Sequence, residues 1–190
     1  MLVSTQRDPR ARRRAMVEAA ADLIAETGAL DITHRRVAER AQVPLGATTY
    51  YFSSLEELTA AAVGRLAERT DEGIAELEAE LSGNEPTPAA IAASLWSYLS
   101  DTARVKADAV LYIAGSQRED LRPLALRWYE GMVRTLSGRV PAESARAIAV
   151  FSDGAMMHTL IHGAPMGRAE IERIVAALLA SPGEGTGGAR

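Results

Sequence analysis

Residues 42–58, QVPLGATTYYFSSLEEL, carry glycine, threonine and tyrosine where a helix that only packs a core would carry leucine and alanine. These residue types are poor or middling helix formers, so a need outside the core sets them. Glycine lets a backbone approach a phosphate or a base edge, because no Cβ stands in the way. The hydroxyls of Thr49, Tyr50 and Tyr51 can bond phosphate oxygens, and Ala47 is small enough to touch a thymine methyl. The stretch therefore has the chemistry of a surface that fits a groove of DNA.

Two histidines offer a different chemistry. His158 and His162 stand four residues apart and would share one helix face, as metal ligands can. The sequence shows no third ligand at a suitable spacing and holds no cysteine, so we expect no metal and no cofactor. A polar contact at an interface, or a helix C-terminal cap by His162, explains the pair as well. Only Asp153 could join them in a catalytic group, and no nucleophile–base pair is recognisable, so we expect no enzyme.

The elements around the opening stretch have the spacing of a helix-turn-helix. Asp8 is the expected cap of a first helix over residues 9–27, with proline at its first position. Thr33 caps a short second helix. A tight turn at residues 42–43 then leads into a third helix over residues 44–51, which includes the opening stretch.

A long helix over residues 54–82, about 42 Å at 1.5 Å per residue, is expected next. Ser54 and Glu57 fit a capping box at its start, and SGNEPTP ends it as a linker. Further helices are expected over residues 88–104, 107–118, 121–138, 142–162 and 168–180. No strand alternation is visible. The fold class is therefore all-α, with an N-terminal three-helix helix-turn-helix head joined by a long helix to a helical body. The expected domains are 1–54 for the head, 55–182 for the body and 183–190 for a disordered tail.

Charge is divided unequally between head and body. The chain has net charge −4, yet residues 1–50 hold eight arginines and six acidic residues, a net +2, so the remainder carries −6. Such a head could meet phosphates, and such a body would not. Arg12 and Arg13 are the expected phosphate contacts, although a solvated helix face also explains them. No run of about 18 apolar residues and no secretory signal is present, so we expect no membrane association and a cytoplasmic location.

The segment THRRVAERAQVPLGATTYYFSSLEEL resembles the DNA-binding head of the TetR family of bacterial transcription regulators. The resemblance covers about residues 10–60 and is carried by the three-helix spacing and by the aromatic pair before the fourth helix. It implies an all-α homodimer, in which each subunit has a helix-turn-helix head joined by a long helix to a helical ligand-binding and dimerisation body. The last two helices of each subunit would form a four-helix bundle with the partner. The family's groove and phosphate contacts fall here on Thr33, His34, Arg35, Leu45, Gly46, Ala47, Thr49, Tyr50 and Tyr51.

Two positions depart from the family pattern. The place that usually holds an aromatic residue in the third helix is Thr49, and the tyrosine follows one residue later. The place at the start of the fourth helix that usually holds lysine is Leu55. Without that lysine one phosphate contact is lost, and we expect the arginine-rich arm at residues 10–14 to supply more of the phosphate binding.

Aromatic residues are scarce, at 5% of the chain, and several gather in the body. Core packing explains each of them, but together they favour a pocket for an apolar or aromatic effector. The expected ligand-binding residues are Trp96, Tyr98, Tyr112, Trp128, Tyr129 and His158.

The last two expected helices are the candidates for a subunit interface. AIAVFSDGAMMHTLI is apolar on nearly all sides, and its small residues permit close approach. A helix that is hydrophobic all round is buried, which near the end of a modest domain implies a partner subunit. The expected interface residues are Phe151, Ala155, Met156, Ile171, Ile174, Val175 and Leu178.

The favoured hypothesis is a ligand-responsive regulator, a homodimeric repressor that a small effector releases from a palindromic operator in double-stranded DNA. The effector would move the long helix and change the separation of the two heads. Two alternatives stay open. A helical enzyme or small-molecule carrier could keep the helix-turn-helix as structure only, and an activator without an effector would lack a sizeable apolar cavity in the body.

Overall fold

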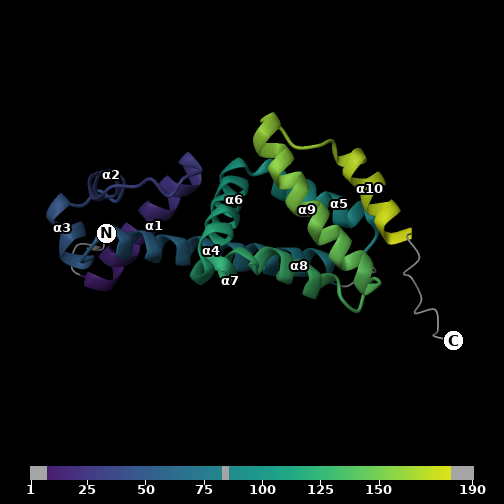
Figure 1. The fold of residues 1–190 in the computed structure, drawn as a ribbon, viewed down its shortest axis with the longest axis horizontal. Coiled ribbons are helices and arrows are strands. Elements are labelled where there is room, and N and C mark those ends of the chain that lie inside the picture. Colours follow the sequence, from purple (N-terminus) through teal and green to yellow (C-terminus); the bar gives the residue numbers. More distant parts are fainter. Residues whose placement is uncertain (1–7, 83–85, 181–190) are drawn as a thin grey trace, which may run out of the picture. The chain divides into compact units, whose positions relative to one another are not determined.

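The computed structural model describes residues 8–82 and 86–180 as ten α-helices and a short 3-10 helix, with no β-strand in these two ranges (Figure 1). The all-α fold class is therefore confirmed. The tail expected at residues 183–190 and part of the linker expected after residue 82 lie outside the described residues.

Local capping signals decide the head. Helix α1 (Pro9–Thr27) begins where Asp8 Oδ1 accepts a hydrogen bond from the Arg10 amide at 2.8 Å, and it ends at Gly28, with φ +69°. Helix α2 (His34–Arg40) begins where Thr33 Oγ1 accepts from the Arg36 amide at 3.2 Å, and α3 (Leu45–Tyr51) follows the turn. All three helices lie where the sequence predicts them, since each depends on a signal within a few residues.

Helix α4 (Leu55–Leu81) has 27 residues and is about 40 Å long. Ser54 Oγ accepts from the Glu57 amide at 3.2 Å, as the capping box predicts. The Glu57 carboxylate reaches one residue further back than the motif requires, because Oε2 accepts from both the amide and the hydroxyl of Ser53, at 2.8 and 2.7 Å.

Two boundaries in the body are predicted wrongly. Helices α5 (Pro88–Ser100) and α6 (Thr102–Gln117) meet at Asp101, several residues before the break expected between 104 and 107. Asp101 Oδ1 accepts from the Arg104 amide at 3.1 Å, so an N-cap signal that was present in the sequence places the break.

The helix expected over residues 121–138 is three elements. They are η1 (Glu119–Leu121), α7 (Arg122–Ala125) and α8 (Arg127–Leu136). The break between the last two falls at Leu126, where no glycine or proline stands in the sequence. Helices α9 (Ala142–His162) and α10 (Arg168–Ala180) have the expected bounds.

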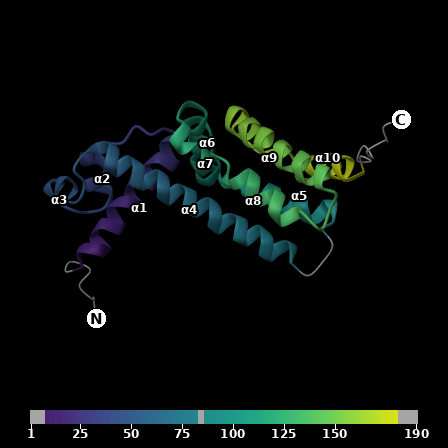
Figure 2. The ribbon, with the colours of Figure 1, turned by 60° about the horizontal axis from the view of Figure 1, so that its bottom comes forward.

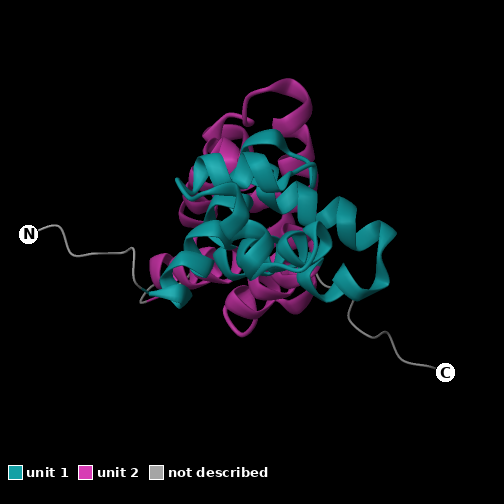
Figure 3. Ribbon diagram, turned by 90° about the vertical axis from the view of Figure 1, so that its left-hand side faces the viewer, with its two compact units in different colours: residues 1–69, 106–125 teal, residues 70–105, 126–190 magenta. Residues whose placement is uncertain are grey.

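The chain forms two compact units (Figure 3). Unit 1 holds the described residues up to Arg69 together with Lys106–Ala125, and unit 2 holds Thr70–Val105 and the described residues from Leu126 onward. Helices α4 and α6 each contribute residues to both units. The domain boundary expected after residue 54 divides the chain by function, and it stays a prediction.

Each unit has its own core. In unit 1, Met16, Ile24, Phe52 and Leu58 are buried together with Val110 of α6. In unit 2, α10 packs mainly on α5, and α9 packs mainly on α8 (Figure 2). The indole of Trp128 donates a hydrogen bond to Ser152 Oγ at 2.8 Å and joins α8 to α9.

The turn between α2 and α3 yields a first prediction. Gln42 has φ +54°, a left-handed conformation that costs a side chain with a Cβ about 1–2 kcal/mol. A β-branched residue suffers more, so Gln42→Val should lower the free energy of unfolding by about 1–2 kcal/mol, whereas Gln42→Gly should leave it within about 0.5 kcal/mol. Chemical denaturation measures both. Equal stability of the two variants would show that the turn relaxes out of the left-handed region.

Candidate nucleic-acid interface and ligand pocket

One side of α3 faces away from the core of unit 1. Tyr50 is 83% exposed, and Leu45, Gly46 and Thr49 are exposed as well, whereas Thr48 is buried. The Cβ position of Gly46 meets no described atom within 4 Å, so the backbone there is open to close approach. The structure thus brings the predicted residues of α3 together on one accessible surface.

The aromatic pair at the end of α3 divides between this surface and the core. The rings of Tyr50 and Tyr51 meet edge to face, with centroids 5.1 Å apart. Tyr51 is half-buried and packs against the core of unit 1, which holds Tyr50 from one side. The contact with Tyr51 therefore fixes the position of the Tyr50 ring, which projects into solvent.

The predicted basic residues of the head lie on two helices. Arg13 is exposed, and its guanidinium carbon lies 4.9 Å from the centroid of the Phe52 ring. This cation–π contact orients the side chain without neutralising its positive charge. Arg12 is half-buried on the same helix. Arg35 is exposed on α2 and donates to Glu39 at 3.0 Å, a surface pair that a phosphate could replace.

The remaining predicted residues begin α2. Thr33 uses its hydroxyl oxygen as the N-cap acceptor and stays exposed, so the hydroxyl proton is left to donate outward. His34 is half-buried beside it. Both stand at the positive end of a helix dipole, which favours a neighbouring anion.

Ion pairs fasten α1 to α4 within unit 1. Arg65 Nε lies 2.8 Å from Glu18 Oε2, and Arg69 Nη2 lies 2.8 Å from Glu18 Oε1 and 2.6 Å from Asp22 Oδ1. Burial raises the pKa of Glu18, but the hydrogen bonds from the two arginines outweigh it, so its pKa lies below the ordinary 4.5. Sequence spacing could not reveal this group, because its members are about 50 residues apart.

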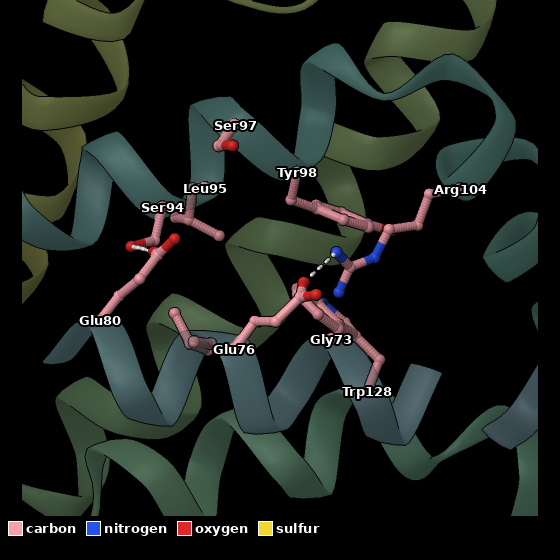
Figure 4. Close-up of a pocket in the computed structure, with 10 residues that line it drawn as sticks. Gly73, Glu76, Glu80, Ser94, Leu95, Ser97, Tyr98, Arg104 and Trp128 are labelled. Carbon is pink, nitrogen blue, oxygen red and sulfur yellow. Dashed lines mark hydrogen bonds and ion pairs between the residues drawn. The ribbon is translucent and has the colours of Figure 1, made fainter. Parts of the chain in front are cut away.

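Unit 2 contains a small pocket of about 40 Å³ between α4, α5, α6 and α8 (Figure 4). The rings of Tyr98 and Trp128 stack there with centroids 4.3 Å apart and an angle of 21° between their planes. Arg104 and Glu76 enter the same pocket and pair at 3.3 Å. Ser94 donates to Glu80 at its far end.

The structure brings only two of the predicted ligand residues into this pocket. Tyr98 and Trp128 line it, whereas Trp96 is exposed on the other side of α5, and Tyr129 and His158 are not among its lining residues. Tyr112 belongs to unit 1. Glu76 and Arg104 also line the pocket and are not among the predicted residues, because no local pattern in the sequence distinguishes them from the other charged residues of the body.

The two histidines of α9 contact each other. The rings of His158 and His162 stack with centroids 4.1 Å apart. Across residues 8–82 and 86–180, no cluster of three or more potential metal-ligating side chains is present.

The predicted interface residues fall into two groups. Ala155, Met156, Ile171 and Val175 are buried by the chain itself and belong to the core of unit 2. Phe151, Ile174 and Leu178 are half-buried. The sequence analysis did not single out the exposed apolar residues of α9, which are Val150, Met157 and Ile161.

Residues 82–181 match the family model of the tetracyclin repressor-like C-terminal domain, which covers more than half of the chain. The chain belongs to the TetR family of transcription regulators. The family that the sequence of the head indicates is therefore confirmed.

Several known proteins are similar to this chain over most of its length. The transcriptional regulator BetI of Rhizobium meliloti (strain 1021) is 28% identical over 164 residues, which cover 82% of this chain and 81% of BetI. A TetR-family member of Streptomyces coelicolor A3 (SCO1917) is 30% identical, with a TM-score of 0.73 over 88% of this chain and 98% of that one. The multidrug binding protein EbrR in complex with proflavin is 32% identical, with a TM-score of 0.69 over 88% of this chain and 99% of that one.

Membership settles the broad class of the protein. TetR-family proteins are transcription regulators and not enzymes, with a DNA-binding helix-turn-helix and a ligand-binding body. This excludes the enzyme alternative. Within the described ranges, no helix combines the length and the apolarity that crossing a bilayer requires.

The ion pairs at Glu18 yield a second prediction. A carboxylate with a lowered pKa stabilises the fold above the unfolded-state pKa, near 4.5, and that stability is lost as the pH falls through the folded-state pKa. Because the Glu18 side chain is 44% exposed, solvent screens the pairs, and Glu18→Gln should lower the free energy of unfolding by only about 0.5–1 kcal/mol at pH 7.

Denaturation at pH 7 and at progressively lower pH measures this difference, which should close below pH 4.5. Glu68→Gln is the matched control, because Glu68 contacts Arg65 at 3.6 Å and is exposed. A difference for Glu18→Gln that persists unchanged into acid would show that packing and not charge stabilises this position.

Proposed function

We propose that the protein is a homodimeric repressor that acts in the cytoplasm on a near-palindromic DNA operator and leaves it when a small aromatic effector binds. The exposed side of α3 carries this proposal. A helix that turns Thr48 and Tyr51 toward the core and directs Gly46, Thr49 and Tyr50 outward is suited to a major groove.

The proposed DNA contacts divide by chemistry. Leu45, Gly46, Ala47 and Thr49 would lie against base edges, where small and apolar groups meet thymine methyls. Arginines of α1 and α2, together with the start of α2, would hold phosphates and set the register of the helix on the duplex. The phosphate contacts are Arg12, Arg13, Thr33, His34, Arg35, Tyr50 and Tyr51.

An exposed apolar stripe on α9 supports a twofold dimer. Val150 and Ile161 are 60% and 75% exposed, and Met157 lies between them on the same side of the helix. Gly154 lies in this stripe, and no described atom comes within 4 Å of its Cβ position, so a second helix could approach closely. Phe151 and the half-buried residues of α10, Ile174 and Leu178, would join the interface. A dimer on this stripe would cover apolar surface that a monomer leaves in water.

The stacked rings of Tyr98 and Trp128 support an aromatic effector. The similar protein EbrR has been crystallised with proflavin, ethidium and malachite green, all of them aromatic compounds. The pocket of this chain holds no more than a few water molecules at about 40 Å³. An effector would therefore have to displace side chains, and that displacement is the structural change the body can transmit.

Two helices can carry this change, since α4 and α6 each contribute to both units. Within unit 1, Lys106 of α6 donates to the Glu26 carbonyl at 3.0 Å, and the Glu26 carboxylate bonds Arg40 of α2 at 2.7 Å. A shift of α6 would thereby reach the helix-turn-helix. Release requires that the effector prefer the state with low DNA affinity, and effector-saturated protein that holds its operator as tightly as free protein would contradict it.

Selection of bound duplexes from a random DNA pool tests the reading head. We expect a twofold-symmetric consensus, with half-sites about one helical turn apart. Tyr50→Ala should weaken binding to that consensus by about tenfold or more, because it removes the contact of a side chain that is 83% exposed on α3. Trp96→Ala is the control, as an exposed aromatic residue of unit 2, and should leave binding unchanged. A pool without enrichment would refute DNA reading by this chain.

The interface has its own test. Ile161→Asp places a charge in the exposed stripe of α9, so the dimer should dissociate in sedimentation equilibrium while the helical content is retained. Ile113→Asp is the control, because Ile113 is an exposed apolar residue of α6 in unit 1. If Ile161→Asp stayed dimeric, the subunits would have to meet elsewhere.

A further inference from the structure

Arg104 occupies the pocket of unit 2 as a bound cation would. Its guanidinium carbon lies 5.3 Å from the ring centroid of Tyr98 and 5.7 Å from that of Trp128 (Figure 4). One of its nitrogens lies 3.3 Å from a carboxylate oxygen of Glu76, and the side chain is only 24% exposed. Two aromatic faces and a carboxylate around a planar cation are the elements of cation recognition.

Gly73 of α4 makes room for this guanidinium. A Cβ at residue 73 would overlap the terminal nitrogen and the central carbon of Arg104. Glycine within a helix is less favourable than alanine, so its place in the middle of a 27-residue helix calls for a reason. The close approach of the arginine head group supplies one.

One donor of the buried arginine is left unsatisfied among the residues that the structure describes. Its Nε is buried and finds no hydrogen-bond acceptor in the described part of the chain. Glu76 is 69% exposed, so water screens its attraction for the guanidinium. A buried donor without an acceptor is unfavourable, which makes this side chain an occupant that a better-fitting cation can replace.

The pocket would carry negative charge once Arg104 had left. The charged residues that line it are Glu76, Glu80 and Arg104 itself. Without the arginine, two carboxylates and two ring faces remain, and such a lining attracts cations and repels anions.

We infer that Tyr98, Trp128 and Glu76 form a cage for a planar organic cation of the amidinium or guanidinium type, and that the effector enters it by displacing Arg104. The inference rests on the proposed function in taking this pocket as the effector site. About 40 Å³ is too little for such a ligand beside the arginine, so the two must exclude each other. Arg104 stands two residues before Lys106, where α6 joins unit 1, so its displacement occurs on a helix that both units share.

A series of three probes of one shape tests the cage. Benzamidinium, benzamide and benzoate carry positive, zero and negative charge on nearly the same frame, and calorimetry measures their binding to the full-length protein without DNA. We expect benzamidinium to bind about tenfold more tightly than benzamide, and benzoate to bind most weakly. Because this comparison uses the wild-type chain, it does not depend on any variant folding.

Variants then identify the resident arginine. Arg104→Ala removes the internal competitor and should tighten benzamidinium binding by about tenfold. Glu76→Gln should reduce the preference for benzamidinium over benzamide several-fold, and its exposure makes the change safe for folding. Arg127→Ala is the matched control, since Arg127 pairs with Asp71 of the same helix α4 and does not line the pocket. It should leave all three affinities unchanged.

Three results would overturn the cage. They are equal binding of the three probes, no binding of benzamidinium, and preferred binding of benzoate that Arg104→Ala abolishes. The last would make Arg104 a receptor for anions.

The operator assay separates this inference from the repressor function. Charge-selective binding of benzamidinium that leaves DNA binding intact would support the cage and contradict release. If the protein bound the three probes without charge selectivity and still bound its operator, the cage would be contradicted and the repressor function would not.

Discussion

Helix α3 packs on the rest of its unit through one side only. The surface proposed to contact DNA, formed by Leu45, Gly46, Thr49 and Tyr50, depends on this one-sided packing. Thr48 is buried with its hydroxyl bonded to the Leu45 carbonyl at 2.8 Å, so a polar side chain enters the core without an unsatisfied donor. Phe52 is buried directly after the helix and lies beneath the Arg13 guanidinium. These two anchors fix the position of α3, while Gly46, Thr49 and Tyr50 are exposed. Their types are therefore free to suit a partner rather than the core.

Helix α1 connects this surface to the remainder of unit 1 through charged groups at two levels. Glu18 and Asp22 bind arginines of α4, and one turn further on Glu26 bonds Arg40 of α2 through its carboxylate and Lys106 of α6 through its carbonyl. Helix α1 is thus bonded to α2 and to both helices that continue into unit 2. Individually such pairs contribute little to stability, but a network of them can fix a direction of movement.

The sequence predicts those parts of the protein that local signals decide. The caps at Asp8, Thr33 and Ser54 place the head correctly because each acts on amides within three residues. The break at Asp101 was also readable from a cap, whereas the split at Leu126 has no local signal and falls where the two units divide. Of the predicted residues of α3, Leu45, Gly46, Thr49 and Tyr50 are exposed and Ala47 is half-buried, whereas Tyr51 packs against the core. Helical period accounts for this division, because it sets which side of the helix faces inward.

The pocket was predictable only in part, since it depends on how four helices pack against one another in space. Aromatic scarcity pointed to Tyr98 and Trp128, yet nothing in the order of residues places Arg104 over their rings. A resident side chain also sets how the pocket can respond. An effector must outcompete a tethered cation, so its apparent affinity is lower than its affinity for the empty cage by the fraction of time that the arginine is absent. Weakening the ion pair between Glu76 and Arg104 would raise the fraction of time that the arginine is absent, and the protein would then respond to less effector. The incoming ligand, however, needs the same carboxylate. Glu76 therefore stabilises both the resident arginine and the incoming ligand. The effector concentration at which such a regulator responds is set by the difference in binding free energy between these two cations, and not by the strength of either contact alone.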